Sequence, residues 1–255
     1  MEAMPSKPIL KVATYNIHKG FSHFNRRMMV HELRDRMRAL GADIVFLQEV
    51  MGEHERHAER FHNWPAEPQY EFLADSVWTD YAYGRNAVYD LGDHGNAVLS
   101  RYPILRAENQ DISTHRYESR GLLHCEIELP ISPVPLHCIC VHLALNERGR
   151  RHQIGALIDR LQAEVPENAP VIVAGDFNDW RNLAGNRLAA ALHLREAFHV
   201  HRGVSARSFP SSFPILRLDR IYIRGFEVRH TEVHHGYPWS RISDHAVLSA
   251  DLALR

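Results

Sequence analysis

Residues 171–179 read VIVAGDFND and are the most specific local signal in the chain. The apolar run 171–174 predicts a short buried strand. Asp176 and Asn178 follow on one short loop, so their side chains can converge on a single point. The alternative is an Asx-turn, in which Asp or Asn only caps backbone groups. Polar residues at the end of a buried strand are typical of α/β scaffolds that carry chemistry.

The segments on either side alternate between predicted strands and helices. Strands are expected at residues 9–16, 43–48, 97–100, 122–129, 136–142, 218–223, 226–233 and 246–252. Helices are expected at residues 26–40, near 53–62, and at 146–165. The run DIVFLQ at 43–48 is nearly all apolar, and its end is expected to place Glu49 on a loop. The pattern predicts a mixed or antiparallel α/β protein.

Length and composition indicate one folded domain over residues 1–255, with its core at about 9–252. Hydrophobic residues make up 45% and charged residues 24% of the chain, which is usual for a globular protein. Thirty Lys and Arg residues against 31 Asp and Glu residues give a formal net charge of −1. No overall basic field therefore attracts nucleic acid or anionic lipid, and any recognition of an anion must be local.

Cysteine usage and the N-terminus favour a cytoplasmic location. Cys125, Cys138 and Cys140 show neither a disulfide framework nor a zinc pattern. The first twenty residues lack the apolar region of a signal peptide, and no run of about 18 apolar residues predicts a transmembrane segment. The 19 histidines are scattered, so most are expected to be surface or structural residues. No feature indicates a protein partner.

Seven short motifs occur where predicted strands end. They are TYNI (14–17), LQEV (47–50), HGNAVLSRYP (94–103), VHL (141–143), GDFND (175–179), LDRIY (218–222) and SDH (243–245). Together and in this order they resemble the endonuclease/exonuclease/phosphatase (DNase I-like) superfamily, from about residue 10 to residue 252. The resemblance implies a four-layer α/β sandwich, in which two packed mixed sheets are flanked by helices and the site lies in a cleft at one edge.

A phosphodiester needs neutralised charge, an activated water and a stabilised leaving oxygen for its hydrolysis. Mg²⁺ prefers oxygen ligands from a few carboxylates, so Glu49 with Asn16 and Asp244 makes a suitable partial cage, and Mn²⁺ is expected to substitute. Taken singly, Glu49 is better explained as an ordinary solvated charge and Asn16 as a turn residue, and it is the ordered set of motifs that favours the metal-binding role. The resemblance places Asp176 beside the attacking water and Asn178 on a phosphate oxygen.

Two histidines are the remaining acid/base candidates. The resemblance pairs His245 with Asp219, which would fix the tautomer of the imidazole and raise its pKa. Taken alone, Asp219 would be interpreted as a salt-bridge partner of Arg220 or Arg217, and His245 as a core histidine. His142 corresponds to the histidine with which DNase-like and sphingomyelinase-like branches stabilise the transition state or protonate the leaving oxygen. Its presence argues against the abasic-site endonucleases.

Other residues are weaker candidates for contact with substrate. Arg120 is expected to grip a phosphate oxygen and Asn96 to shape the cleft floor, although a structural role fits both. A basic cluster of Arg148, Arg150 and Arg151 begins near the proposed cleft and can assist an anionic substrate. The aromatic residues that precede the central motif either line the cleft or pack in the core; they are Trp64, Trp78, Tyr81 and Tyr83.

The sequence therefore predicts a Mg²⁺-dependent hydrolase of an anionic phosphoester, in particular a phosphodiesterase acting on a small or lipid-linked substrate. One alternative is a DNase I-like nuclease, which the near-zero net charge and the lack of a Lys/Arg run interleaved with aromatics disfavour. A second alternative is an inactive binding module with the same fold. The loss of Glu49, Asp176, Asn178, Asp219 or His245 would favour that module, and all five residues are present.

Overall fold

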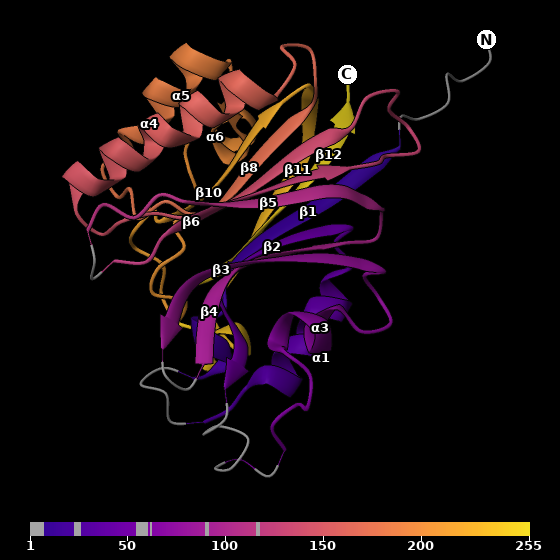
Figure 1. The fold of residues 1–255 in the computed structure, drawn as a ribbon, viewed down its shortest axis with the longest axis vertical. Coiled ribbons are helices and arrows are strands. Elements are labelled where there is room, and N and C mark those ends of the chain that lie inside the picture. Colours follow the sequence, from indigo (N-terminus) through magenta and orange to yellow (C-terminus); the bar gives the residue numbers. More distant parts are fainter. Residues whose placement is uncertain (1–7, 23–26, 55–60, 62, 90–91, 116–117) are drawn as a thin grey trace.

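The computed structural model describes residues 8–22, 27–54, 61, 63–89, 92–115 and 118–255. Its strands form two six-stranded mixed sheets (Figure 1). The first sheet, in the order β11-β12-β1-β2-β4-β3, contains β1 (Ile9–Asn16), β2 (Ile44–His54), β3 (Asp80–Tyr89), β4 (Gly92–Ser100), β11 (Phe226–His234) and β12 (Val247–Leu254). The second, in the order β5-β6-β7-β8-β10-β9, contains β5 (Ile104–Asp111), β6 (Gly121–Ile127), β7 (Leu136–His142), β8 (Val171–Asp176), β9 (Arg195–Glu196) and β10 (Asp219–Arg224).

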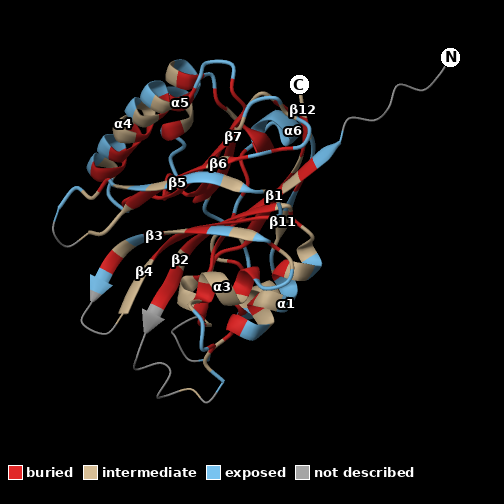
Figure 2. Ribbon diagram, turned by 45° about the vertical axis from the view of Figure 1, so that its right-hand side comes forward, coloured by how far each residue is buried: buried red, intermediate tan, exposed pale blue. Residues whose placement is uncertain are grey.

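The two sheets pack against each other through alternate residues of their strands. On β1, Val12 faces the second sheet, and on β8, Ile172 and Ala174 face the first. These residues are almost fully buried, as the red central strands in Figure 2 show. Because side chains alternate along a strand, the opposite faces are left for helices to cover.

Helices cover both outer faces. The first sheet is covered by α1 (Val30–Leu40) and α3 (Gln69–Ala74), and the second by α4 (Glu147–Glu164) and α5 (Ala184–Leu192). A short helix, α6 (Ala197–Arg202), packs on β10 and β11, and 3-10 turns occur at η1 (His18–Gly20) and η3 (Trp239–Arg241). The predicted four-layer α/β sandwich is confirmed. No helix in the described ranges is long and apolar enough to cross a membrane.

Most of the predicted elements occur at or near their predicted positions. The strands at residues 9–16 and 136–142 are found as predicted. The helix predicted at 146–165 is α4, in which Asn146 is the N-cap and accepts a hydrogen bond from the amide of Gly149. This cap satisfies an amide that has no partner inside the helix.

Three of the predictions were wrong in part. The helix predicted from residue 26 begins at Val30, because Met28 bridges to Phe21 and Met29 donates its amide to the carbonyl of Gly20. Residues 53–54, predicted to begin a helix, belong to β2, and most of the remaining segment lies outside the described residues. Glu49 is not on a loop: it lies within β2, where the pairing register with β4 shifts.

Candidate active site

Strand register places three of the predicted site residues side by side. In the second sheet, His142 of β7 is opposite Asp176 of β8, and Asp176 is opposite Asp219 of β10. Residues that face each other across paired strands project from the same side of the sheet. His142, Asp176 and Asp219 therefore form a row across three strands at the edge of the sandwich.

The backbone around Asp176 fixes the direction of its carboxylate. Its Oδ1 accepts a hydrogen bond from the Asn178 amide at 2.9 Å, which is the Asx-turn considered above. Its Oδ2 faces the site and lies 3.5 Å from Nε2 of His142 and 3.8 Å from Nε2 of His245. Asn178 has a positive φ of 49° and donates its side-chain amide to the carbonyl of Leu143. The turn thus ties the motif to the end of β7 and leaves one carboxylate oxygen for the site.

His245 lies on the loop before β12 and bonds to Asp219, as the resemblance implied. Its Nδ1 is 2.9 Å from Oδ2 of Asp219, and both side chains are buried. Burial by itself would lower the pKa of His245, but the carboxylates of Asp219 and Asp176 outweigh it and raise that pKa to about 10. His245 is therefore an imidazolium at neutral pH.

The two neighbours of His245 have their own shifts in pKa. Burial raises the pKa of Asp176 to about 6, although the charge of His245 opposes this. Burial and, after it, the positive charge of Arg120 hold the pKa of His142 well below its usual value. At neutral pH the site thus contains one charged and one neutral imidazole on either side of a carboxylate. Environments that move pKa values apart in this way are typical of acid/base sites.

The first sheet contributes Asn16 from the end of β1 and Glu49 from within the parallel strand β2. Nδ2 of Asn16 lies 3.2 Å from Oδ2 of Asp176 and 3.5 Å from Oε1 of Glu49. Glu49 is half-buried and has a positive φ of 56°, which is uncommon for a residue other than glycine. Ser243 donates a hydrogen bond to the carbonyl of Asn16 at 2.7 Å. Asn16 therefore connects the two sheets at the site.

Asp244 lies on the same loop as His245, and its Oδ1 is 3.6 Å from Nδ1 of His18. Asn96 is fully buried and donates to the carbonyls of Gly121 and Cys140, so it joins the two sheets beneath the site. Arg120 is half-buried, and its charge acts on His142. All ten predicted site residues are thus in the described structure, and their roles stay predictions.

Sequence reasoning missed two residues of this region, Lys19 and His94. The positive charge of Lys19 acts on both His94 and His142. Burial, followed by the charge of Lys19, lowers the pKa of His94 to about 4. Both residues lie in or beside the quoted motifs, because Lys19 follows TYNI and His94 begins HGNAVLSRYP. Their place in or beside these motifs was therefore a weak signal, because a single Lys or His has no local signature of its own.

Other predicted candidates lie away from this cluster. Trp78 is buried under α1 and donates its indole N–H to the carbonyl of Ala42, and Tyr83 stacks on Tyr70 with ring centroids 4.5 Å apart. Trp64 stacks on Phe21, whereas Tyr81 is largely exposed. Trp78 and Tyr83 therefore pack in the core, which was one of the two alternatives considered for these aromatic residues.

The donor set suits a hard divalent cation. Glu49 and Asp176 lie beside Asn16, and their carboxylate oxygens are ligands that Mg²⁺ prefers. A second group, Asp176, Asp219 and His245, has potential ligand atoms within 4.8 Å of one another. In that group Asp219 and His245 are also bonded to each other.

Residues 13–245 match the model of the Endonuclease/Exonuclease/phosphatase family. The protein YbhP of Escherichia coli (strain K12) is 51% identical over 244 residues, which cover 96% of each chain. An endonuclease/exonuclease/phosphatase from Beutenbergia cavernae DSM 12333 superposes with a TM-score of 0.76 at 20% identity, covering 96% of this chain and 72% of that one. A mannosyl-6-phosphatase of Bacteroides thetaiotaomicron VPI-5482 gives 0.70 at 16% identity, covering 96% and 100%. The chain belongs to the endonuclease/exonuclease/phosphatase family, whose members hydrolyse phosphoesters.

Proposed function

We propose that the chain is a Mg²⁺-dependent phosphodiesterase whose central residue is Asp176. The observation that carries the proposal is the surroundings of one oxygen: Oδ2 of Asp176 has Asn16, His142 and His245 within 3.8 Å. A buried carboxylate with a pKa of about 6 is a suitable general base near neutral pH, because it is mostly ionised and still basic. Asp176 then accepts the proton of the attacking water.

The two histidines act on the phosphate and on the leaving group. His245, held as an imidazolium by Asp219, donates a hydrogen bond to a phosphate oxygen and stabilises the charge that grows there in the transition state. His142 is neutral and donates a hydrogen bond through its ring N–H to the leaving oxygen, which then takes its proton from solvent water. Asn178 positions a phosphate oxygen, and Arg120 contributes positive charge beside His142.

Glu49 and Asn16 would hold Mg²⁺, with Asp244 nearby. A bound Mg²⁺ neutralises phosphate charge and lowers the barrier to attack. Asp176, Asp219, Glu49 and Asp244 concentrate negative charge at the place where an anionic substrate must bind. A divalent cation offsets that repulsion.

The preferred substrate is a small or lipid-linked phosphodiester. The formal net charge of −1 gives no extended positive field, whereas binding of duplex DNA normally depends on several Lys/Arg–phosphate contacts. Recognition of the substrate therefore depends on the few cations beside the site, such as Arg120 and Lys19.

A panel of phosphoesters tests both parts of the proposal. Purified protein with Mg²⁺ at low salt is assayed on bis(p-nitrophenyl) phosphate, on phospholipid headgroup esters and on plasmid DNA. Asp176→Asn should lower kcat at least about 100-fold, the lower range for losing a general base. The matched control is Asp159→Asn, the same change at an exposed position of α4, which should have no effect.

Each outcome of the panel has a distinct meaning. No turnover of any ester by the wild-type protein, with binding retained, would favour the inactive module. Efficient cleavage of plasmid DNA that falls steeply as salt rises would show that the chain is a nuclease and that the proposed preference for small substrates is wrong. The proposed roles of the residues would still hold. Equal losses in Asp176→Asn and Asp159→Asn would remove Asp176 from the mechanism.

A further inference from the structure

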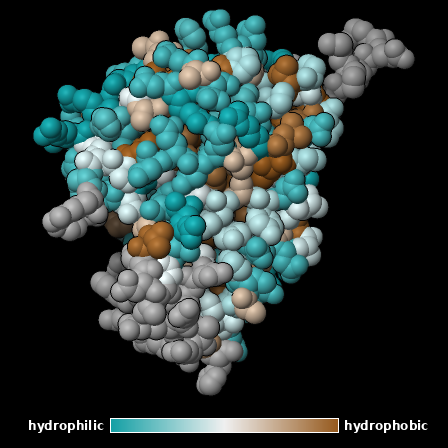
Figure 3. Space-filling model, viewed as in Figure 1, coloured by the Kyte–Doolittle hydropathy of each residue, from teal (hydrophilic) through white to brown (hydrophobic). Residues whose placement is uncertain are grey.

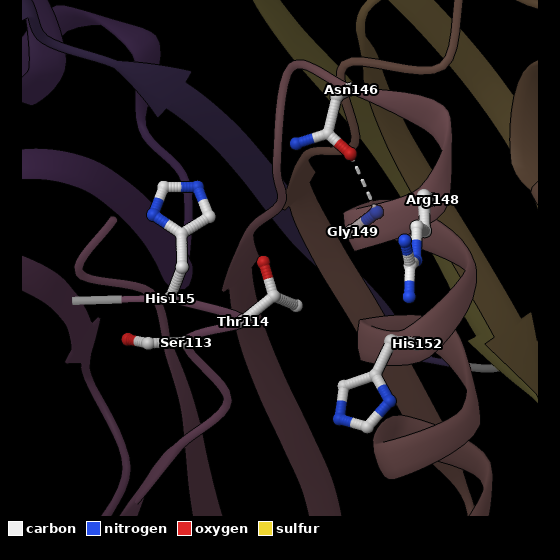
Figure 4. Close-up of a pocket in the computed structure, with 7 residues that line it drawn as sticks. All are labelled: Ser113, Thr114, His115, Asn146, Arg148, Gly149 and His152. Carbon is white, nitrogen blue, oxygen red and sulfur yellow. Dashed lines mark hydrogen bonds between the residues drawn. The ribbon is translucent and has the colours of Figure 1, made fainter. Parts of the chain in front are cut away.

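A second hollow lies beside the proposed active site, between the loop after β5 and the first turns of α4. It has a volume of about 480 Å³. Its lining residues come from those two segments and are Ser113, Thr114, His115, Asn146, Arg148, Gly149 and His152. Figure 4 shows the loop residues on one wall and the residues of α4 and its N-cap on the other.

The lining of this hollow is polar and basic. It includes Arg148 and His152 and no Asp or Glu among the described residues. Within the described ranges no carboxylate pairs with Arg148, whereas Arg151 on the same helix pairs with Glu147 at 3.0 Å. Asn146 bonds to Gly149 through its oxygen, so its amide N–H₂ group remains directed toward the loop wall (Figure 4). The hollow therefore presents N–H donors and positive charge.

The hollow continues toward the proposed active site. A neighbouring hollow of about 440 Å³ shares His115 and Asn146 with it and is also lined by His94 and Arg120. Arg120 comes directly before β6, whose Leu122 pairs with Val141 of β7, so this neighbour lies at the end of β7 that carries His142. The acidic residue in the lining of this neighbouring hollow is Glu118, whose carboxylate accepts hydrogen bonds from Thr114 and Gln153. The two adjoining hollows thus form a polar trough that leads from Arg120 and His94 to Arg148.

The surface around α4 is polar, which suits the binding of an ionic ligand. Figure 3 shows that this face is mostly hydrophilic, with apolar residues scattered among polar ones. Arg148, which pairs with no carboxylate among the described residues, is well suited to a phosphate, because a guanidinium can donate two parallel hydrogen bonds to the phosphate oxygens. Thr114 and Ser113 also line the hollow, but their hydroxyl groups already bond to Glu118 and to the backbone of Arg120.

We propose that this hollow is a second phosphate subsite, so that the substrate is a phosphodiester that carries a further phosphate group beyond the scissile one. The inference rests on the proposed function, because it takes the row around Asp176 as the place of cleavage. Arg148 is the principal contact of the second phosphate, with His152 and Asn146 beside it. The second phosphate can belong to a small bisphosphorylated molecule or to the next residue of a nucleic-acid strand.

Direct binding tests the subsite separately from catalysis. Isothermal titration calorimetry with the full chain and Mg²⁺ compares an alkanediol monophosphate with alkanediol bisphosphates of increasing length. At the length that spans both sites the bisphosphate should bind at least about tenfold tighter, the effect of one good charge-assisted contact. Arg148→Ala should remove that advantage. Arg151→Ala, the same loss of charge on the same helix, should keep it.

The remaining arms separate the possible outcomes. A tetranucleotide that binds more tightly than every bisphosphate, with the gain lost in Arg148→Ala, assigns the second phosphate to a nucleic-acid strand. Equal affinity for monophosphate and bisphosphate at every length, or equal effects of Arg148→Ala and Arg151→Ala, would overturn the subsite. Failure of the proposed function is distinguishable, since it appears as no hydrolysis of bis(p-nitrophenyl) phosphate by the wild-type protein whatever the titrations give.

Discussion

Substitution of Gly175 by alanine should damage both stability and catalysis, because β7 and β8 approach closely at this residue. Gly175 has a φ of 148°, and a Cβ atom there would lie 1.9 Å from the carbonyl oxygen of Val141. Real Cβ atoms stay at least 3.0 Å from such an atom, so the strands must separate by about 1 Å. The glycine-only backbone adds about 1–3 kcal/mol of strain. We expect the free energy of unfolding to fall by at least about 3 kcal/mol, which lowers Tm by about 6–12 °C in a chain of this size.

The catalytic effect follows from the next residue, Asp176. A displacement of about 1 Å at a reacting group can cost about 100-fold in rate, so kcat on bis(p-nitrophenyl) phosphate should fall by that order at a temperature where the variant is folded. The matched control is Gly155→Ala in α4, where no atom lies within 4 Å of the new methyl apart from the adjoining residues and the backbone of the helix itself. It should raise stability by about 0.8 kcal/mol and leave kcat unchanged. Wild-type Tm and kcat in Gly175→Ala would refute the reasoning.

Three further outcomes follow from the site and from one buried histidine pair. Excess EDTA should abolish turnover, and Mg²⁺ or Mn²⁺ should restore it. Glu49→Gln should raise the Mg²⁺ concentration needed for half-maximal activity, and an unchanged Mg²⁺ titration would exclude Glu49 as a ligand. Asp219→Asn combined with His245→Ala should lower kcat little more than the worse single change, and additive losses would contradict their coupling. Burial lowers the pKa of His124 to about 4, and its Nε2 lies 3.0 Å from Nδ1 of His137. Because the unfolded state takes up the proton first, the free energy of unfolding should fall by up to about 3 kcal/mol as pH falls from about 6.5 to 4, measured by urea titration. His124→Gln should flatten that dependence, and an unchanged slope would contradict it.

The predictable part of the fold consists of elements whose own residues determine them. The strand β8 is a run of apolar residues buried on both faces, and such a run needs no knowledge of its neighbours. The helix α4 has a stripe of apolar side chains, an Asn cap at one end and Pro166 after the other. In both cases burial and local hydrogen bonding point to the same structure.

The strands β3 and β5 were not predicted, for a physical reason. β3 reads DYAYGRNAVY and β5 reads ILRAENQD, and most residues of β5 are exposed or half-exposed at the edge of the second sheet. Such strands are held by pairing with β4 and β6 and have little apolar pattern of their own. The position of Glu49 was missed similarly, because the register shift inside β2 arises from its pairing with β4.

The sequence predicted which residues belong to the site better than it predicted how they are arranged. Each motif placed a polar residue at a strand end, but the row of His142, Asp176 and Asp219 depends on the register of three strands that are far apart in sequence. Lys19 and His94 were missed because a lone Lys or His has no local signature, and only their proximity to His142 distinguishes them. Long-range register is a property of the whole sandwich, which a short motif cannot encode.

Asp176 shows that the structural and the catalytic interpretation of a short motif can hold together. Its Oδ1 forms the Asx-turn with Asn178, which fixes the rotation of the carboxylate. The same bond leaves Oδ2 directed at Asn16, His142 and His245. The turn is therefore the means by which a buried strand aims one oxygen at the site with little rotational freedom. A catalytic group that is fixed before the substrate arrives loses less entropy in the reaction, so the turn itself favours Asp176 as the base.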